Sequence, residues 1–255
     1  MKNILKTFNL HFSTIIFILL SFLVGYFKNV ICIFLIVIIH EIGHLFFIKL
    51  FKYQVTSITI YPFGGITKVS KRINDSIIKE RIISLGGIFF QLLLFLIIKL
   101  LHLKYDLLLF YNQTILLFNI IPIIPLDGSV FLKSILESHM SYEKALKYTV
   151  LISFLIYLLF LFCNIYFQLN NYFICLLLLF QIYTFHKEIA TLKNRFYLER
   201  YLYNFPYKNI INESTTNYHL LRKNTKHFFY NGKYYESEKT ILNSYFADFS
   251  RQRDR

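Results

Sequence analysis

Cysteine is scarce in this sequence. The three cysteines, Cys32, Cys163 and Cys175, lie in apolar runs and lack the spacing of a metal site. Cysteines of this kind pack as small hydrophobic side chains, so we assign them no chemistry. The chain also lacks internal repeats and low-complexity linkers. No small-residue cleavage site follows the first apolar run, which ends in Gly25-Tyr26-Phe27, so we expect this run to stay as a helix.

Apolar residues dominate instead. They make up 56% of 255 residues, and the mean hydropathy of +0.49 is too high for an ordinary soluble domain. The net charge of +14 is typical of some nucleic-acid-binding proteins, but the apolar runs have about the length that crosses a bilayer. They cover residues 10 to 27, 29 to 50, 82 to 101, 107 to 136, 146 to 168 and 172 to 186. The sequence therefore predicts an all-α polytopic membrane protein with about six transmembrane helices.

The basic residues are distributed unevenly between the loops. With a cytoplasmic N-terminus, the external loops hold only Lys28, Lys99 and Lys104. The inner segments before the tail hold Lys2, Lys6, Lys52, Lys68, Lys71, Arg72, Lys79, Arg81, Lys133, Lys144 and Lys147. Cytoplasmic loops of membrane proteins are enriched in lysine and arginine, so we expect both termini to be cytoplasmic.

Composition divides the chain into a membrane domain, residues 1–186, and a polar extension, residues 187–255. The extension holds 13 basic and 7 acidic residues, a net charge of +6, and many tyrosines. RNA binding is one interpretation, but no RNA-binding motif is present. A basic face beside an anionic leaflet explains the charge better, so we expect a cytoplasmic tail and no nucleic-acid partner.

A short β-hairpin is predicted between the second and third spans. The β-branched segment from Val55 to Tyr61 is separated by Gly64-Gly65 from a second segment, Ile66 to Val69. A hairpin with a free edge could accept an extended peptide as an added strand, which would make Gly64 and Gly65 substrate-binding residues. An ordinary connecting hairpin is the alternative.

The second span carries the motif H-E-x-x-H as His40-Glu41-Ile42-Gly43-His44. Residues four apart lie one turn apart on the same helical face, so His40 and His44 can bind one metal ion, with Glu41 as the base that activates water. Polar side chains inside a span are costly, about 2.5 to 3.5 kcal/mol for a charged group at the helix centre. A divalent ion bound by both histidines would offset that cost. The alternative is that the three polar side chains satisfy one another and have only a structural role.

A third ligand is expected from the fourth span, where Pro122, Pro125 and Gly128 interrupt the helix around Asp127. Irregular backbone at membrane depth has to be surrounded by protein or line a polar cavity, which favours Asp127 as a metal ligand. The alternative is a proline kink at which Asp127 reaches toward the cytoplasmic surface. Asn119 is expected on the same helix, about two turns before Asp127, where it could orient the substrate backbone. Two imidazoles and one carboxylate favour one Zn²⁺ per chain.

These two motifs, HEIGH and the stretch from Asn119 to Gly128, together resemble the site-2 protease family of intramembrane metalloproteases. The resemblance covers about residues 29 to 136 and implies that His40, His44 and Asp127 bind zinc and that Glu41 activates water. The stretch from Tyr61 to Gly65 and the six spans look most like the sporulation branch. That branch implies a bacterial cell membrane, the membrane around the forespore included, and a membrane-associated sigma-factor precursor as the substrate, with inhibitory membrane partners.

The sequence departs from the family pattern at two places. Many members of the branch end in a nucleotide-sensing CBS domain, but the tail after Lys187 shows none. Many relatives also have glycine, proline and asparagine in the third span, where this chain has Gly86-Gly87 and Gln91. Gly86-Gly87 is interpreted as close helix packing, and Gln91 either as packing or as a polar partner in the site.

Two functions compete with an intramembrane metalloprotease. A non-catalytic adaptor of the same fold would not need the base Glu41. A metal transporter should repeat polar residues along several spans, but spans one, five and six have only scattered ones. The six other histidines lie at span ends or in the tail and are not expected to bind metal: His11, His102, His139, His186, His219 and His227.

Overall fold

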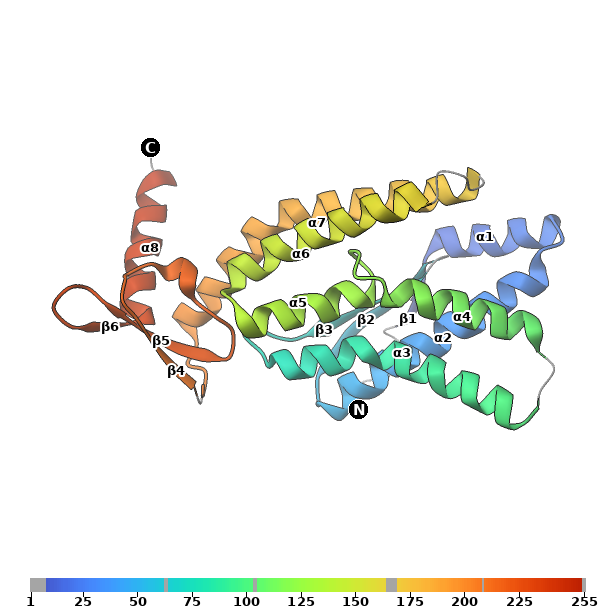
Figure 1. The fold of residues 1–255 in the computed structure, drawn as a ribbon, viewed down its shortest axis with the longest axis horizontal. Helices are drawn as coiled ribbons and strands as arrows, with labels where there is room; N and C mark the ends of the chain where they lie inside the picture. The colour runs from blue at the N-terminus through green and yellow to red at the C-terminus, as the bar shows by residue number, and fades with distance from the viewer. Residues whose placement is uncertain (1–7, 62–63, 103–104, 164–168, 208, 254–255) are drawn as a thin grey trace. The chain divides into compact units, whose positions relative to one another are not determined.

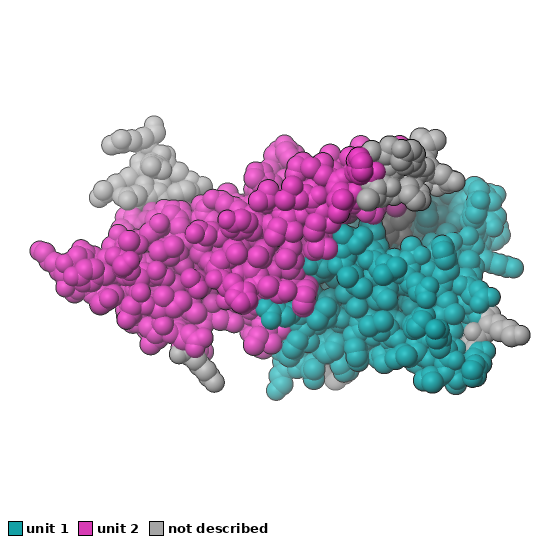
Figure 2. Space-filling view, viewed as in Figure 1, with its two compact units in different colours: residues 1–71, 81–121, 126–128 teal, residues 72–80, 122–125, 129–255 magenta. Residues whose placement is uncertain are grey.

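The computed structural model describes residues 8–61, 64–102, 105–163, 169–207 and 209–253. Figure 1 shows its helices and strands. The chain forms two compact units (Figure 2). Unit 1 contains residues 1–71, 81–121 and 126–128, and unit 2 contains residues 72–80, 122–125 and 129–255. The predicted division at 186/187 falls within one helix, α7 (Leu169–Leu202), and it stays a prediction.

Four helices are long and apolar enough to cross a membrane: α2 (Phe27–Leu50), α3 (Ile77–Leu100), α6 (Tyr142–Cys163) and α7. The first apolar run forms α1 (Phe12–Leu23), whose 12 residues extend about 18 Å, less than a hydrocarbon core of about 30 Å. The described residues thus provide four spanning helices by length, and the count of six stays a prediction.

The fourth apolar run is not one helix. Helix α4 (Asp106–Ile120) ends before Pro122, and α5 (Asp127–His139) begins at the predicted ligand. Ile121 is extended because a residue before proline disfavours the helical conformation, and Pro122 has no N–H to continue the hydrogen-bond ladder. The prediction that Asn119 shares a helix with Asp127 is therefore wrong.

The predicted hairpin is present, and it belongs to a three-stranded sheet. Strand β2 (Gln54–Tyr61) pairs antiparallel with β3 (Gly64–Ser70), and β1 (Phe8–Leu10) pairs parallel with the other side of β2. Gly64 and Gly65 lie within β3, opposite Tyr61 and Ile60, rather than in the turn. Residues 62 and 63, between the two strands in the sequence, lie outside the described residues.

Unit 2 combines helices with a second sheet. Its tail portion comprises β4 (Asn209–Glu213), a 3₁₀ turn (Tyr218–Leu220), β5 (Thr225–Tyr230), β6 (Tyr235–Ser237) and α8 (Glu238–Arg253). Strand β5 pairs parallel with β4 and antiparallel with β6. Helices predominate, as predicted, but the described residues also form two three-stranded sheets, whereas the sequence predicted β-structure only in the hairpin.

The core of unit 2 joins the tail to the helices. The ring of Tyr142, at the start of α6, stacks on Phe196 of α7 at 4.2 Å between centroids. Leu221, Phe229 and Leu242 of the tail are buried against these rings. The tail is thus a folded part of unit 2.

Candidate metal centre

Helix α2 places the two histidines of the motif side by side. His40 and His44 are one turn apart, and their ring centroids are separated by 4.7 Å. His40 is buried, and His44 is partly buried. Side chains at positions i and i+4 lie on the same face of a regular helix, and this apolar segment forms such a helix.

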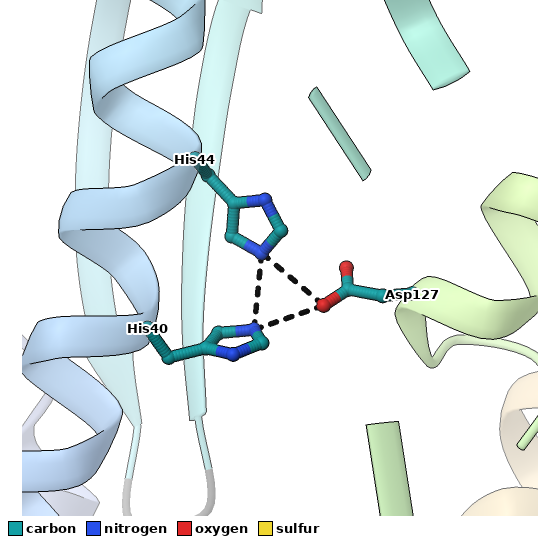
Figure 3. Close-up of side chains that lie close together, drawn as sticks. All are labelled: His40, His44 and Asp127. Atoms are coloured by element: carbon teal, nitrogen blue, oxygen red, sulfur yellow. Dashed lines mark hydrogen bonds and ion pairs between the residues drawn. The ribbon is translucent and has the colours of Figure 1, made fainter. Parts of the chain in front are cut away.

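Asp127, the first residue of α5, completes a three-residue cluster (Figure 3). Its Oδ2 atom lies 2.9 Å from Nε2 of His40 and 3.2 Å from Nε2 of His44. The two Nε2 atoms are 3.0 Å apart. Among the described residues, this is the one group of histidine, cysteine or carboxylate side chains that could hold a metal ion.

The protons of both imidazoles point away from the cluster. Nδ1 of His44 donates to the backbone oxygen of Ile83 at 2.7 Å, and Nδ1 of His40 donates to Oε1 of Gln91 at 3.0 Å. In neutral imidazoles, this leaves a lone pair on each Nε2 atom, directed at the other and at Oδ2 of Asp127. Three lone pairs at this separation repel one another unless a cation lies between them.

The donor set fits zinc. Zn–N bonds of about 2.0 Å in a tetrahedral site place neighbouring ligand atoms roughly 3.3 Å apart, close to the separations of 2.9 to 3.2 Å in the cluster. Two imidazole nitrogens and one carboxylate oxygen also match the ligands of catalytic zinc sites, which keep a fourth position open. One Zn²⁺ per chain is the ion that these residues suit.

Gln91 is a polar partner in the site, as one of the two interpretations of the sequence proposed. It is fully buried in α3, and its backbone oxygen accepts a hydrogen bond from the buried amide of Asn112 at 3.1 Å. Asn112, on α4, was not singled out from the sequence, although a polar side chain in an apolar run was a usable signal. The Gln91 side chain thus holds the His40 ring at Nδ1, and Asn112 links α4 to the backbone of α3 at the same residue.

Substituting Gln91 with leucine should weaken zinc binding by about 10- to 100-fold, the usual effect of losing a hydrogen-bond partner of a metal-ligating histidine. Leucine has a similar volume but cannot accept the Nδ1 proton of His40. Competition with a chromophoric zinc chelator would measure the affinity. Gln113→Leu, at an exposed position of α4, is the matched control. Equal affinities for Gln91→Leu and the wild type would contradict this role.

Glycines bring α2 and α3 into backbone contact. A Cβ atom at Gly43 would lie 2.2 Å from the backbone oxygen of Gly86. A Cβ atom at Gly87 would lie 2.4 to 2.6 Å from three atoms of the His40 ring. Separations under about 3 Å are not tolerated, so only glycine at these positions lets α3 pack against the metal cluster. The close packing predicted from Gly86-Gly87 is confirmed.

Glu41 lies against β3. Oγ1 of Thr67 donates to Oε2 of Glu41 at 3.2 Å. A Cβ atom at Gly65 would lie 2.6 to 2.8 Å from the Glu41 carboxyl group, so a side chain at this position would displace it. The sequence did not indicate Thr67, because only the strand register brings it to the glutamate.

The remaining candidate, Asn119, is partly buried near the end of α4. Its amide donates to the backbone oxygen of Ile115, one turn earlier, at 3.0 Å. The break after α4 is tight, since a Cβ atom at Gly128 would lie 2.2 Å from the backbone oxygen of Ile120. Gly128 therefore lets α5, with Asp127 at its start, begin directly beside the end of α4.

The chain is similar to known proteins in sequence and in fold. Residues 28–106 match the model of peptidase family M50. Stage IV sporulation protein FB of Bacillus subtilis (strain 168) is 28% identical over 193 residues, which are 71% of this chain and 67% of the relative. The solved structure of the site-2 protease from Methanocaldococcus jannaschii is similar in fold, with a TM-score of 0.53 and 24% identity over 71% of this chain and 90% of that chain. The predicted resemblance is confirmed: the chain matches peptidase family M50 over residues 28–106, is similar in sequence to a stage IV sporulation protein, and shares its fold with a solved site-2 protease.

Proposed function

We propose that this protein is an intramembrane zinc metalloprotease that hydrolyses a peptide bond of a membrane-associated protein near the cytoplasmic face. The observation that carries the proposal is the convergence of three lone pairs from His40, His44 and Asp127. A glutamate, Glu41, directly follows the first of these ligands in the sequence. The match to a peptidase family supports the hydrolytic chemistry.

Zinc, when bound, would supply Lewis acidity that polarises a carbonyl group and acidifies water. His40, His44 and Asp127 would hold it. Glu41 would accept the proton of the attacking water and pass it to the leaving amine nitrogen, as a general base and then a general acid. The hydrogen bond from Thr67 orients the carboxylate for both steps.

Strand β3 would bind the substrate in extended form. In the order β1-β2-β3, β3 has one described neighbour, so its other edge can accept a peptide strand. Gly65 and Thr67 of this strand lie against Glu41, so a peptide paired with β3 would run close to the base. Gly64 and Gly65 are therefore proposed as substrate-binding residues.

Asn119 is proposed to orient the substrate backbone. Asn119→Ala should reduce cleavage roughly 10-fold, because a misplaced scissile bond reacts slowly, and should leave zinc bound. Cleavage rate and zinc content of the purified protein measure the two effects, with Gln113→Ala on the same helix as the control. Loss of the metal from Asn119→Ala would refute an orienting role.

The membrane topology is proposed from the charge distribution and from the helices. Both termini are placed in the cytoplasm, with α1 and the α4–α5 pair completing six crossings. The likeness to a stage IV sporulation protein supports the membrane around the forespore as the location and a sigma-factor precursor as the substrate, with inhibitory membrane partners.

Co-expression tests this function. Wild-type protein and Glu41→Gln are each expressed with a candidate membrane-associated sigma-factor precursor, and the precursor is followed by gel mobility. Shortening by the wild type alone supports both the protease and the sporulation role. If neither shortens the precursor, the substrate assignment fails, and equal shortening by both would refute Glu41 as the base.

A further inference from the structure

A lysine of the tail is buried among carboxylates in unit 2. Lys223 is 1% exposed at its side chain, and its Nζ atom lies 2.8 Å from Oε2 of Glu80 and 3.0 Å from Oε2 of Glu137. Lys133 lies 3.9 Å from the other oxygen of Glu137. Lysine ammonium groups thus lie beside both carboxylates, and charges that are paired in this way can be buried at tolerable cost.

The first carboxylate belongs to α3. Glu80 lies in the first turn of this helix. Three residues later the backbone oxygen of Ile83 accepts the Nδ1 proton of His44, and Gln91, further along, accepts that of His40. One helix therefore carries both the contact to Lys223 and the hydrogen-bond partners of the two histidines.

The second carboxylate belongs to α5, the helix that begins at Asp127. Glu137 lies ten positions after Asp127 in the same 13-residue helix, about 15 Å along the axis. A regular helix of this length is stiff, so fixing its end at Glu137 restricts the direction in which Asp127 is presented. At the other end, Gly128 packs directly against the backbone of Ile120.

We propose that Lys223 is a positioning residue, through which the folded tail holds α3 and α5 so that Asp127 and the two histidines keep their mutual geometry. The inference rests on the proposed metal site. It gives the tail a role in maintaining the metal site, and this role does not require a nucleotide-binding domain. Any partner that displaces β5 or the loop before it would act on zinc binding through this lysine.

Lys223→Met tests the proposal, because methionine keeps the unbranched apolar part of the side chain and removes the charged ammonium group. Glu80 and Glu137 then lose the ammonium group that lies between them, and the repulsion of two buried carboxylates should force the two helices apart. Lys233→Met, at an exposed position in the same domain, is the matched control. Lys223→Met combined with Glu80→Gln removes one charge of each sign, so the net charge of the cluster returns to that of the wild type.

Hydrogen exchange followed by mass spectrometry and zinc competition provide the two readouts in the full-length protein. Lys223→Met should speed exchange along α5 up to its Asp127 end and weaken zinc binding about tenfold, and the double variant should recover both. Faster exchange confined to residues 203–253 with unchanged zinc affinity would overturn the proposal. If the wild type binds no zinc, the proposed function fails, and the spread of exchange into α5 still decides whether Lys223 fixes this helix.

Discussion

Replacing Glu41 with glutamine is expected to reduce peptide cleavage by about 10²- to 10⁴-fold, the usual contribution of a positioned general base. Glutamine has the shape of glutamate, and its carbonyl oxygen can still accept the hydrogen bond from Thr67. The contact with Gly65 is likewise retained. The substitution therefore removes the proton acceptor while leaving α2 and β3 in place.

Zinc content is expected to stay at one ion per chain in Glu41→Gln, because the glutamate is not one of the three clustered ligands. Elemental analysis of the purified variant gives the metal, and single-turnover assays give the rate. Glu188→Gln, at an exposed position of α7, controls for the loss of one negative charge. A cleavage rate within a fewfold of the wild type would show that another group accepts the proton.

Replacing Asp127 with asparagine is expected to remove the metal as well as the activity. The carboxylate supplies the one negative charge in the cluster, and its Oδ2 atom lies within 3.2 Å of both Nε2 atoms. The asparagine amide could instead direct its N–H groups at these lone pairs. The variant would then satisfy the two imidazoles without a cation, and zinc would have to compete with these hydrogen bonds.

The expected loss of zinc affinity in Asp127→Asn is at least about 100-fold, the upper end of what losing a partner outside the coordination sphere costs. Chelator competition measures it, and a thermal melt in chelator should show a fold at least as stable as the metal-free wild type. Asp106→Asn, at the exposed start of α4, is the control. Full zinc occupancy in Asp127→Asn at low free zinc would exclude Asp127 as a ligand.

The sequence predicted the cluster because both parts of it are local patterns. HEIGH requires only a helix, and a carboxylate beside two prolines in an apolar run indicates a break that lines a site. The same prolines explain why the predicted position of Asn119, on one helix with Asp127, was wrong. Counting turns from Asn119 to Asp127 assumes one helix, but Pro122 separates α4 from α5.

Contacts that depend on tertiary pairing could not be predicted. Strand β1 is three residues long and is defined by its pairing with Ile58 to Ile60, far along the chain. The hydrogen bond from Thr67 to Glu41 depends on the register of β3. The ion pairs of Lys223 with Glu80 and Glu137 form only when the tail is folded. The polar tail carried no strong periodic signal, so its sheet was missed.

The most direct test of the account is the metal dependence of cleavage in purified, reconstituted protein. Zinc is removed with a chelator and then restored in measured amounts while hydrolysis of a membrane-associated substrate is followed. The account predicts that hydrolysis stops on removal and returns in full at one zinc ion per chain, in the wild type and not in Glu41→Gln. Hydrolysis that continues in the zinc-free protein would contradict it.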